Sequence, residues 1–137
     1  MAKERKSAYL LIAHGTREKE GENAFFQFVE EFRHVFPHRN IQPAFLELSR
    51  PAIPEAIQSC IQAGAEAIFV LPLMLFPGRH INQDIPRFIQ EAKQAHPEVD
   101  FHYAGALALG PSRKGTKMSE PKMLDLLRTK IAGLEGD

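Results

Sequence analysis

The sequence predicts an α/β fold in which an open, parallel, four-stranded sheet carries helices on both faces, as in flavodoxin-like layering. Strand-like and helix-like periodicities alternate along the chain in the order β-α-β-α-β-α-β-α. The apolar run 67–75 lacks polar alternation, as expected of a strand covered on both faces. The 137 residues suffice for one core. We therefore expect residues 1–137 to form a single domain.

The first half of the chain predicts two strands, each followed by a helix. Residues 9–13 and 41–48 are the strands. From Glu22, apolar side chains recur at helical spacing until Pro37, so five large residues share one face: Phe25, Phe28, Val29, Phe32 and Phe36. The second helix has Ser49 as its predicted N-cap and Gly64 as its C-terminal stop. Its apolar stripe is Ile53, Ala56, Ile57, Cys60 and Ile61.

The second half repeats this pattern. After the strand at 67–75, Asp84 is the predicted cap of a helix whose apolar stripe is Ile85, Phe88, Ile89 and Ala92. Residues 99–109 predict a fourth strand. Residues 111–120 are basic and rich in Gly, Pro and Ser, so we expect a mobile loop insertion there. A last helix follows, with Leu124, Leu127 and Ile131.

Composition argues against several classes of function. Seventeen basic side chains balance seventeen acidic ones, so we expect neither a nucleic acid nor a membrane as partner. The single cysteine, Cys60, excludes an intramolecular disulfide, and the longest apolar run is about half of a ~20-residue membrane span. The apolar stretch near the N-terminus is too short for a signal peptide. These features predict a cytoplasmic protein.

Three side chains follow three of the predicted strands. His14 follows the first strand, Glu47 ends the second, and His80 follows the third. In open α/β sheets, ligands bind beyond the carboxyl ends of the strands, so we expect these groups to meet at one edge. Imidazole and carboxylate ligands suit a divalent first-row metal, and histidine also suits proton transfer. Each residue alone is typical of a hydrogen-bonded loop or a solvated strand end; their shared edge favours a site.

Arginines lie near the same predicted edge, at Arg17, Arg50 and Arg79. They are either solvated surface residues or ligands for substrate carboxylates, which match the planar guanidinium. Phe76 and Gly78 could form an open apolar wall for a flat ligand, or belong to ordinary loop packing. The remaining histidines do not join this set: we expect His34, His38 and His96 to be exposed near helix ends and His102 to pack within a strand.

Three motifs together resemble the sirohydrochlorin chelatases, which are small class II tetrapyrrole chelatases. They are LLIAHGTRE at 10–18, FLELSRPAIPEAI at 45–57 and VLPLMLFPGRHINQDIP at 70–86, and the resemblance spans residues 8 to 110. It implies the parallel chelatase fold, with His14 and His80 as active-site histidines and Glu47 as the motif glutamate. Residues 111–120 depart from the family pattern.

The resemblance also implies a reaction. Family members insert cobalt, iron or nickel into sirohydrochlorin, so the divalent metal is a substrate and no organic cofactor is expected. Short members work as homodimers. His14 and His80 would present the metal and accept the departing pyrrole protons, while Glu47 completes the metal shell or orients a histidine.

Three other functions are alternatives to this one. A non-catalytic metal-binding module or metallochaperone would use the same three residues. A histidine phosphatase is disfavoured because Ala13 stands where its motif needs arginine. A nucleotide binder is disfavoured because Gly15 stands alone after the first strand, without a glycine-rich phosphate loop.

Overall fold

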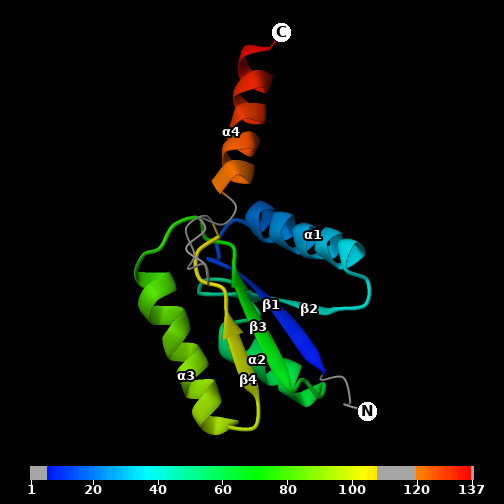
Figure 1. The fold of residues 1–137 in the computed structure, drawn as a ribbon, viewed down its shortest axis with the longest axis vertical. Coiled ribbons are helices and arrows are strands. Elements are labelled where there is room, and N and C mark those ends of the chain that lie inside the picture. The colour runs from blue at the N-terminus through cyan, green and yellow to red at the C-terminus, as the bar shows by residue number, and fades with distance from the viewer. Residues whose placement is uncertain (1–5, 108–119, 137) are drawn as a thin grey trace.

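Four parallel strands form one sheet in the order β2-β1-β3-β4, and a helical segment follows each strand (Figure 1). This computed structural model describes residues 6–107 and 120–136. The elements are β1 (Ser7–Ala13), α1 (Lys19–Val35), β2 (Asn40–Phe45), α2 (Ile53–Gln62), β3 (Ala67–Pro72), the π-helical turn η1 (His80–Asp84), α3 (Ile85–Ala95), β4 (Asp100–Tyr103) and α4 (Glu120–Glu135). The predicted alternation and the parallel sheet are confirmed.

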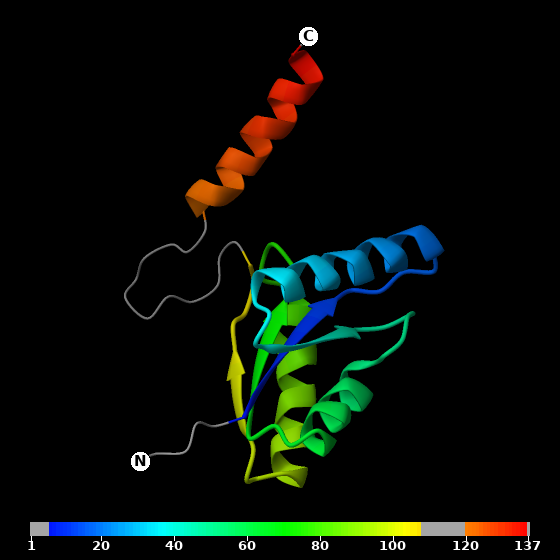
Figure 2. The ribbon, with the colours of Figure 1, turned by 90° about the vertical axis from the view of Figure 1, so that its right-hand side faces the viewer.

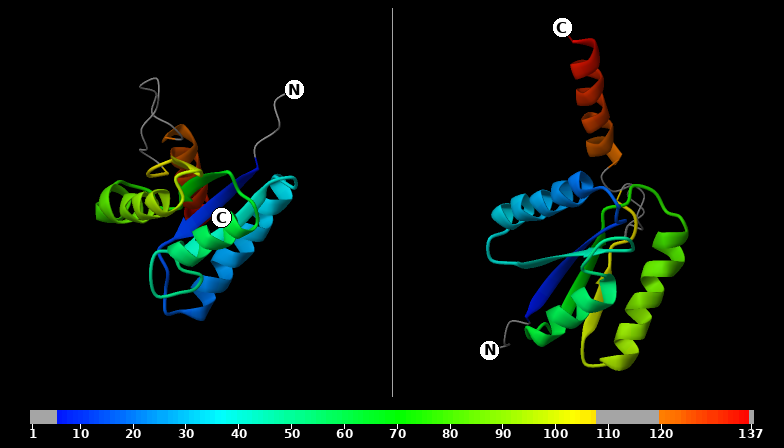
Figure 3. Two further views of the ribbon diagram at one scale, coloured as in Figure 1. Left: turned by 90° about the horizontal axis from the view of Figure 1, so that it is seen from below. Right: turned by 180° about the vertical axis from the view of Figure 1, so that it is seen from behind.

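Helices lie on both faces of the sheet, as predicted (Figures 2 and 3). β1 is a central strand and pairs with both β2 and β3. Successive side chains of a strand point to opposite faces, so β1 supplies two cores. Leu10 and Ile12 join the cluster under α2 and α3, whereas Leu11 joins the cluster under α1 with Phe25 and Val29.

Several elements differ in extent from the prediction. α1 begins at Lys19, three residues before Glu22, and of its five predicted stripe residues only Phe25 and Val29 are buried. Strands β2 and β4 are shorter than expected. β2 ends at Phe45, and the chain turns through a positive φ at Leu48. β4 ends at Tyr103, after which Gly105 turns the backbone away with a φ of 75°.

Both predicted helix caps are wrong. α2 begins at Ile53, too far along the chain for Ser49 to cap it, and the backbone N–H of Ala52 instead donates to Glu55 Oε1 at 2.9 Å. Asp84 makes no capping hydrogen bond, because helical geometry already begins at His80. In both cases the polar side chain bonds elsewhere, near the edge of the sheet.

Two further sequence predictions concern the loop insertion and the absence of a membrane-spanning segment. Of the predicted insertion 111–120, residues 111–119 lie outside the described residues, and Glu120 is the first residue of α4. Within the described ranges, the helices are all too short or too polar to cross a bilayer.

Candidate metal centre

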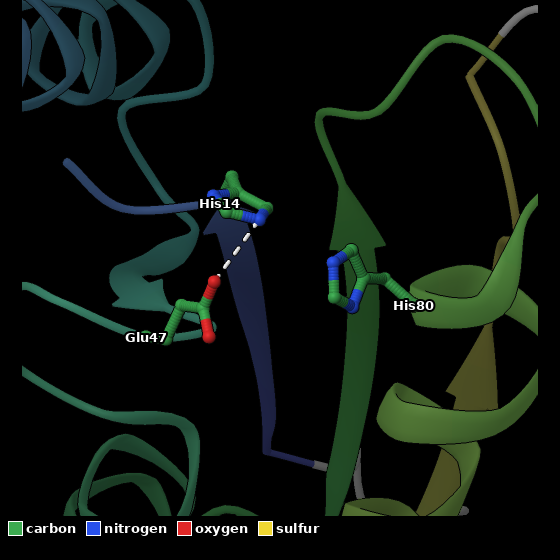
Figure 4. Close-up of side chains that lie close together, drawn as sticks. All are labelled: His14, Glu47 and His80. Atoms are coloured by element: carbon green, nitrogen blue, oxygen red, sulfur yellow. Dashed lines mark ion pairs between the residues drawn. The ribbon is translucent and has the colours of Figure 1, made fainter.

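His14, Glu47 and His80 converge at the carboxyl edge of the sheet (Figure 4). His14 directly follows β1, Glu47 lies two residues beyond β2, and His80 is the first residue of η1. Each offers a ligand atom, and these atoms all lie within 4.8 Å of one another. The three residues that the sequence places at one edge are therefore brought together.

Backbone pairing beyond the strand ends aligns His14 with Glu47. The N–H of Leu46 donates to Ala13 O at 2.9 Å, and the N–H of Glu47 donates to His14 O at 3.1 Å. The pairing of β1 with β2 thus continues past both strands. It places His14 Nε2 3.3 Å from Glu47 Oε1, the contact dashed in Figure 4.

Gly15 allows this close approach of two loops. Its φ is 105°, and a Cβ at this position would stand 1.7 Å from the carbonyl oxygen of Glu47. Only glycine fits without a shift of the backbone. The loops are joined again one residue further on, where buried Ser49 accepts from Thr16 N–H at 3.1 Å and donates to Thr16 O at 2.8 Å. Ser49 therefore connects the two loops that present His14 and Glu47.

His80 faces His14 from the other side of the site. Their ring centroids lie 5.0 Å apart at an interplanar angle of 63°. Nδ1 of His80 is 2.7 Å from Asp84 Oδ2, one turn further along the helical segment. With its Nδ1–H donated to this carboxylate, His80 keeps Nε2 as a free lone pair for a metal ion or a proton. Asp84 thus selects a tautomer and fixes the ring.

The turn that carries His80 is held by β4. The hydroxyl of Tyr103 donates to Ile81 O at 2.7 Å. Burial raises the pKa of Tyr103 to about 12, so its hydroxyl stays protonated and remains a donor through the neutral range. π-Helical turns are often found at functional sites, and this one places the imidazole and its carboxylate partner on the same side.

The geometry suits a metal ion that is held by few ligands. Bonds from Zn²⁺ to nitrogen or oxygen ligands are about 2.0–2.2 Å, so donors on opposite sides of one such ion lie at most ~4.4 Å apart. The observed 4.8 Å limit needs only a small closure. The side chains of His14, Glu47 and His80 are 48%, 53% and 41% exposed, which leaves coordination positions open to solvent or substrate.

A shallow hollow adjoins these three residues. It is lined by Leu46, Glu47, Arg79, His80, Asp84, Arg87 and Phe88. Arg79 and Arg87 bring positive charge beside the histidine, and Arg79 Nε also lies 4.0 Å from Asp84 Oδ1. A flat substrate with acidic substituents could therefore meet both a metal and guanidinium groups here.

The other predicted substrate residues are exposed and do not line the hollow. Arg17, Phe76 and Gly78 face solvent. Arg50 is 88% exposed and its Nε lies 3.5 Å from Glu55. Among the other histidines, His34 and His38 are exposed, while His96 is half-buried beside Glu98. His102 lies within β4 as predicted, but its ring is exposed instead of packed inside.

Sequence reasoning missed three residues at this edge. Asp84 was expected to cap a helix, although a histidine four residues before it signals an i,i+4 pair. Arg87 lies on α3, one turn beyond Asp84, and the sequence pattern predicts no role for it. No sequence pattern marks Tyr103, because its hydrogen bond to Ile81 O depends on how β4 lies beside η1.

Comparison with known proteins shows which family this chain resembles. The CbiX family model matches residues 8–118. The sirohydrochlorin ferrochelatase of Arabidopsis thaliana chloroplasts is 33% identical over 92 residues, which cover 67% of this chain and 41% of that protein. The sirohydrochlorin cobaltochelatase of Priestia megaterium is 29% identical over 123 residues, covering 89% and 36%.

A solved structure shares the fold. The sirohydrochlorin chelatase SirB of Bacillus subtilis subspecies spizizenii, crystallised in complex with cobalt, superposes with a TM-score of 0.72 at 28% identity. The match covers 88% of this chain and 50% of SirB. The chain therefore spans about two fifths of these curated relatives and half of this structural neighbour. Since the family model matches most of its residues, the chain belongs to the CbiX family.

Proposed function

We propose that this protein inserts a divalent metal ion into sirohydrochlorin. The observation that carries the proposal is the convergence of His14, Glu47 and His80 on one open point at the carboxyl edge of the sheet. Relatives named as cobalto- and ferrochelatases of the same tetrapyrrole support the reaction, with cobalt or iron as the metal substrate. Nickel accepts the same imidazole and carboxylate ligands and is a third possible metal.

The three residues would hold the metal loosely and pass it to the ring. Three protein ligands leave a four- to six-coordinate ion with positions for water and then for pyrrole nitrogens. Two ring N–H protons must leave as the M²⁺ ion enters, so the charge of the macrocycle is conserved. As each histidine releases the metal, its Nε2 lone pair becomes available to accept one of these protons. Asp84 keeps the lone pair of His80 directed at the site.

Arginines would orient the substrate. Sirohydrochlorin carries eight carboxylates, and Arg79 and Arg87 stand beside the metal-binding residues. Arg17 and Arg50 are exposed at the same edge and can reach more distant carboxylates, while Phe76 and Gly78 offer an unobstructed wall. Binding by such exposed pairs should weaken as salt is added. No organic cofactor is needed in this scheme.

We further propose that the chain works as a homodimer in the cytoplasm. One chain covers half of SirB, so two copies supply a molecule of similar size. The only cysteine, Cys60, is free and buried, in keeping with a reducing compartment.

Metal insertion can be followed by absorbance when purified protein, sirohydrochlorin and Co²⁺, Fe²⁺ or Ni²⁺ are mixed in turn. We expect insertion well above the rate without protein. His14→Ala and His80→Ala should each reduce it more than about 100-fold, a loss larger than that for removing a group behind a metal ligand. His34→Ala changes an exposed histidine on α1 and serves as the matched control.

Two results would contradict this proposal, one its mechanism and the other its reaction. Wild-type rates in both site variants would remove the histidines from the mechanism. Metal binding without any change in the spectrum of the tetrapyrrole would instead identify a metallochaperone that uses the same residues.

A further inference from the structure

The helical segment that carries His80 changes its hydrogen-bond register just before Pro86. At the end of η1 the N–H of Ile85 donates to His80 O, five residues back, whereas in an α-helix it would donate to Ile81 O. In this wider register the next donor for Ile81 O would be the N–H of residue 86, which is a proline and has none. Within the described residues of η1 and α3, no backbone donor is therefore left for the carbonyl of Ile81.

A side chain from the sheet supplies the missing donor. The hydroxyl of Tyr103 donates to Ile81 O at 2.7 Å. Tyr103 is the last residue of β4 and pairs with Val70 of β3, and the N–H of Ala104 donates to Val70 O at 3.0 Å. Ile81 is only 5% exposed, so water has little access to its carbonyl. Because an unpaired buried carbonyl is costly, the hydroxyl stabilises the register that leaves this group without a backbone partner.

Pro86 also disfavours the alternative register. In a continuous α-helix the proline ring would collide with the carbonyl of the residue four positions earlier, which is Asn82. A π-helical turn just before the proline avoids this collision, at the cost of the hydrogen bond that Ile81 O would otherwise accept. Pro86 and Tyr103 therefore act on the same turn: the first disfavours the α-helical register, and the second stabilises the π-helical one.

The register decides where His80 points. Each residue of an α-helix turns by ~100°, so removing the extra residue from this turn would rotate the residues before Ile85 by about that angle relative to α3. Such a rotation would also move Ile81 out of the core. In the observed register, His80 faces His14 across the site (Figure 4), and its Nδ1 lies 2.7 Å from Asp84 Oδ2. The orientation of the imidazole thus depends on the π-helical turn.

We propose that Tyr103 is a positioning residue for His80, which acts through the carbonyl of Ile81 and the register of η1. The hydroxyl replaces the backbone donor that Pro86 lacks, and the turn that it stabilises directs the imidazole into the metal centre. The inference rests on the proposed function only for the role of His80 as a metal ligand. The register itself can be tested on the metal-free protein.

Proton NMR of the metal-free protein tests the turn directly. The Nδ1–H that His80 donates to Asp84 gives a signal downfield of the amides, and its absence in Asp84→Ala assigns it. Tyr103→Phe keeps the ring and removes the hydroxyl, so this signal should broaden or disappear. Tyr9→Phe removes the hydroxyl of the only other tyrosine and should leave the signal unchanged. An unchanged His80 signal in Tyr103→Phe would overturn the proposal.

Titration with Co²⁺ shows whether the hydroxyl acts through His80. Tyr103→Phe should weaken Co²⁺ binding per folded molecule about tenfold, as expected for the loss of a group behind a metal ligand. The same loss should appear in a His14→Ala background. In a His80→Ala background it should vanish, because the ring that Tyr103 positions is gone. Equal losses in the two backgrounds would indicate a general structural effect and overturn the positioning role.

Pro86→Ala tests why the hydroxyl is needed. This substitution restores an N–H at position 86 and removes the ring, so Ile81 O gains a backbone donor in either register. Tyr103→Phe should therefore lower the midpoint of urea unfolding less in Pro86→Ala than in the wild type. Equal shifts would show that the hydroxyl does not replace the missing donor, and would overturn the proposal. If these tests succeed but sirohydrochlorin receives no metal, the chelatase function alone is refuted.

Discussion

The interior of the sheet and its carboxyl edge are made by neighbouring residues of the same strands, yet they are held by different forces. In the interior, Leu10, Ile12, Ile68 and Val70 are fully buried and pack against α2 and α3. At the edge, the side chains of the metal centre are about half exposed and depend on backbone hydrogen bonds, one glycine and one carboxylate for their positions. Stability and function should therefore respond to different substitutions.

The largest expected effect on stability comes from the interior. Leu10→Ala removes a fully buried side chain from β1 and should lower the free energy of unfolding by about 2–5 kcal/mol. Metal affinity per folded molecule should stay near wild type, because Leu10 lies in the core cluster under α2 and α3 and is not one of the metal-binding residues. Urea unfolding and a Co²⁺ titration measure the two quantities. If metal affinity fell along with stability, the interior and the edge would not be separable.

Gly15→Ala should affect both regions at once. The new Cβ collides with Glu47 O at a positive φ, so the loops must separate. We expect a loss of about 1–3 kcal/mol in stability and at least a tenfold loss of metal affinity. Gly78→Ala is the matched control on the same edge, since nothing lies within 4 Å of its Cβ position. Equal stability and equal metal affinity in Gly15→Ala and Gly78→Ala would show that the close approach of the two loops determines neither quantity.

Asp84 tests whether the edge is ordered by a specific carboxylate. Asp84→Ala frees the His80 ring and should cost 10–100-fold in metal affinity without unfolding the protein. Asp84→Asn keeps an acceptor oxygen and should fall between Ala and wild type. Glu98→Gln, beside His96, is a carboxylate control remote from the site. Affinities for Co²⁺ that do not follow this order would mean that Asp84 does not position His80.

The smallest effect concerns Cys60 and alkaline pH. Burial raises its pKa from 9.0 to about 11, so the folded state keeps a proton that the unfolded state releases. This contribution to stability is complete below pH ~9 and is lost as pH rises towards 11, at about 1.4 kcal/mol per unit. The thermal unfolding temperature of Cys60→Ala should decline less between pH 9 and 10 than that of wild type. If the unfolding temperatures of wild type and Cys60→Ala fell equally with pH, the raised pKa of Cys60 in the folded state would be contradicted.

Much of the fold follows from the sequence because its signals are local. Apolar periodicity and the apolar run at 67–75 predict the alternating elements, and the connection rules then predict a parallel sheet. The same rules bring the ends of β1, β2 and β3 to one edge. For this reason the sequence alone groups His14, Glu47 and His80, and the structure brings them together.

The predictions that proved wrong depended on three-dimensional contacts that the local sequence pattern does not show. Ser49 has the composition of a helix cap, but its hydroxyl is taken by Thr16, 33 residues away in sequence. Phe28 has the spacing of a core residue but is 43% exposed, and within residues 6–107 and 120–136 no helix lies over the adjoining part of the sheet. Asp84 stands where a cap of α3 is expected, but its carboxylate bonds to His80, because helical geometry already begins at His80.

The most direct measurement is X-ray absorption spectroscopy of the protein loaded with one equivalent of Co²⁺. If His14, His80 and Glu47 bind one cation together, the spectrum of wild type will show two imidazole ligands and oxygen scatterers on a single ion per chain. Replacing His14 and His80 by alanine will abolish the imidazole signal. An unchanged signal in that double variant, or a wild-type ion bound without imidazole, would contradict the account.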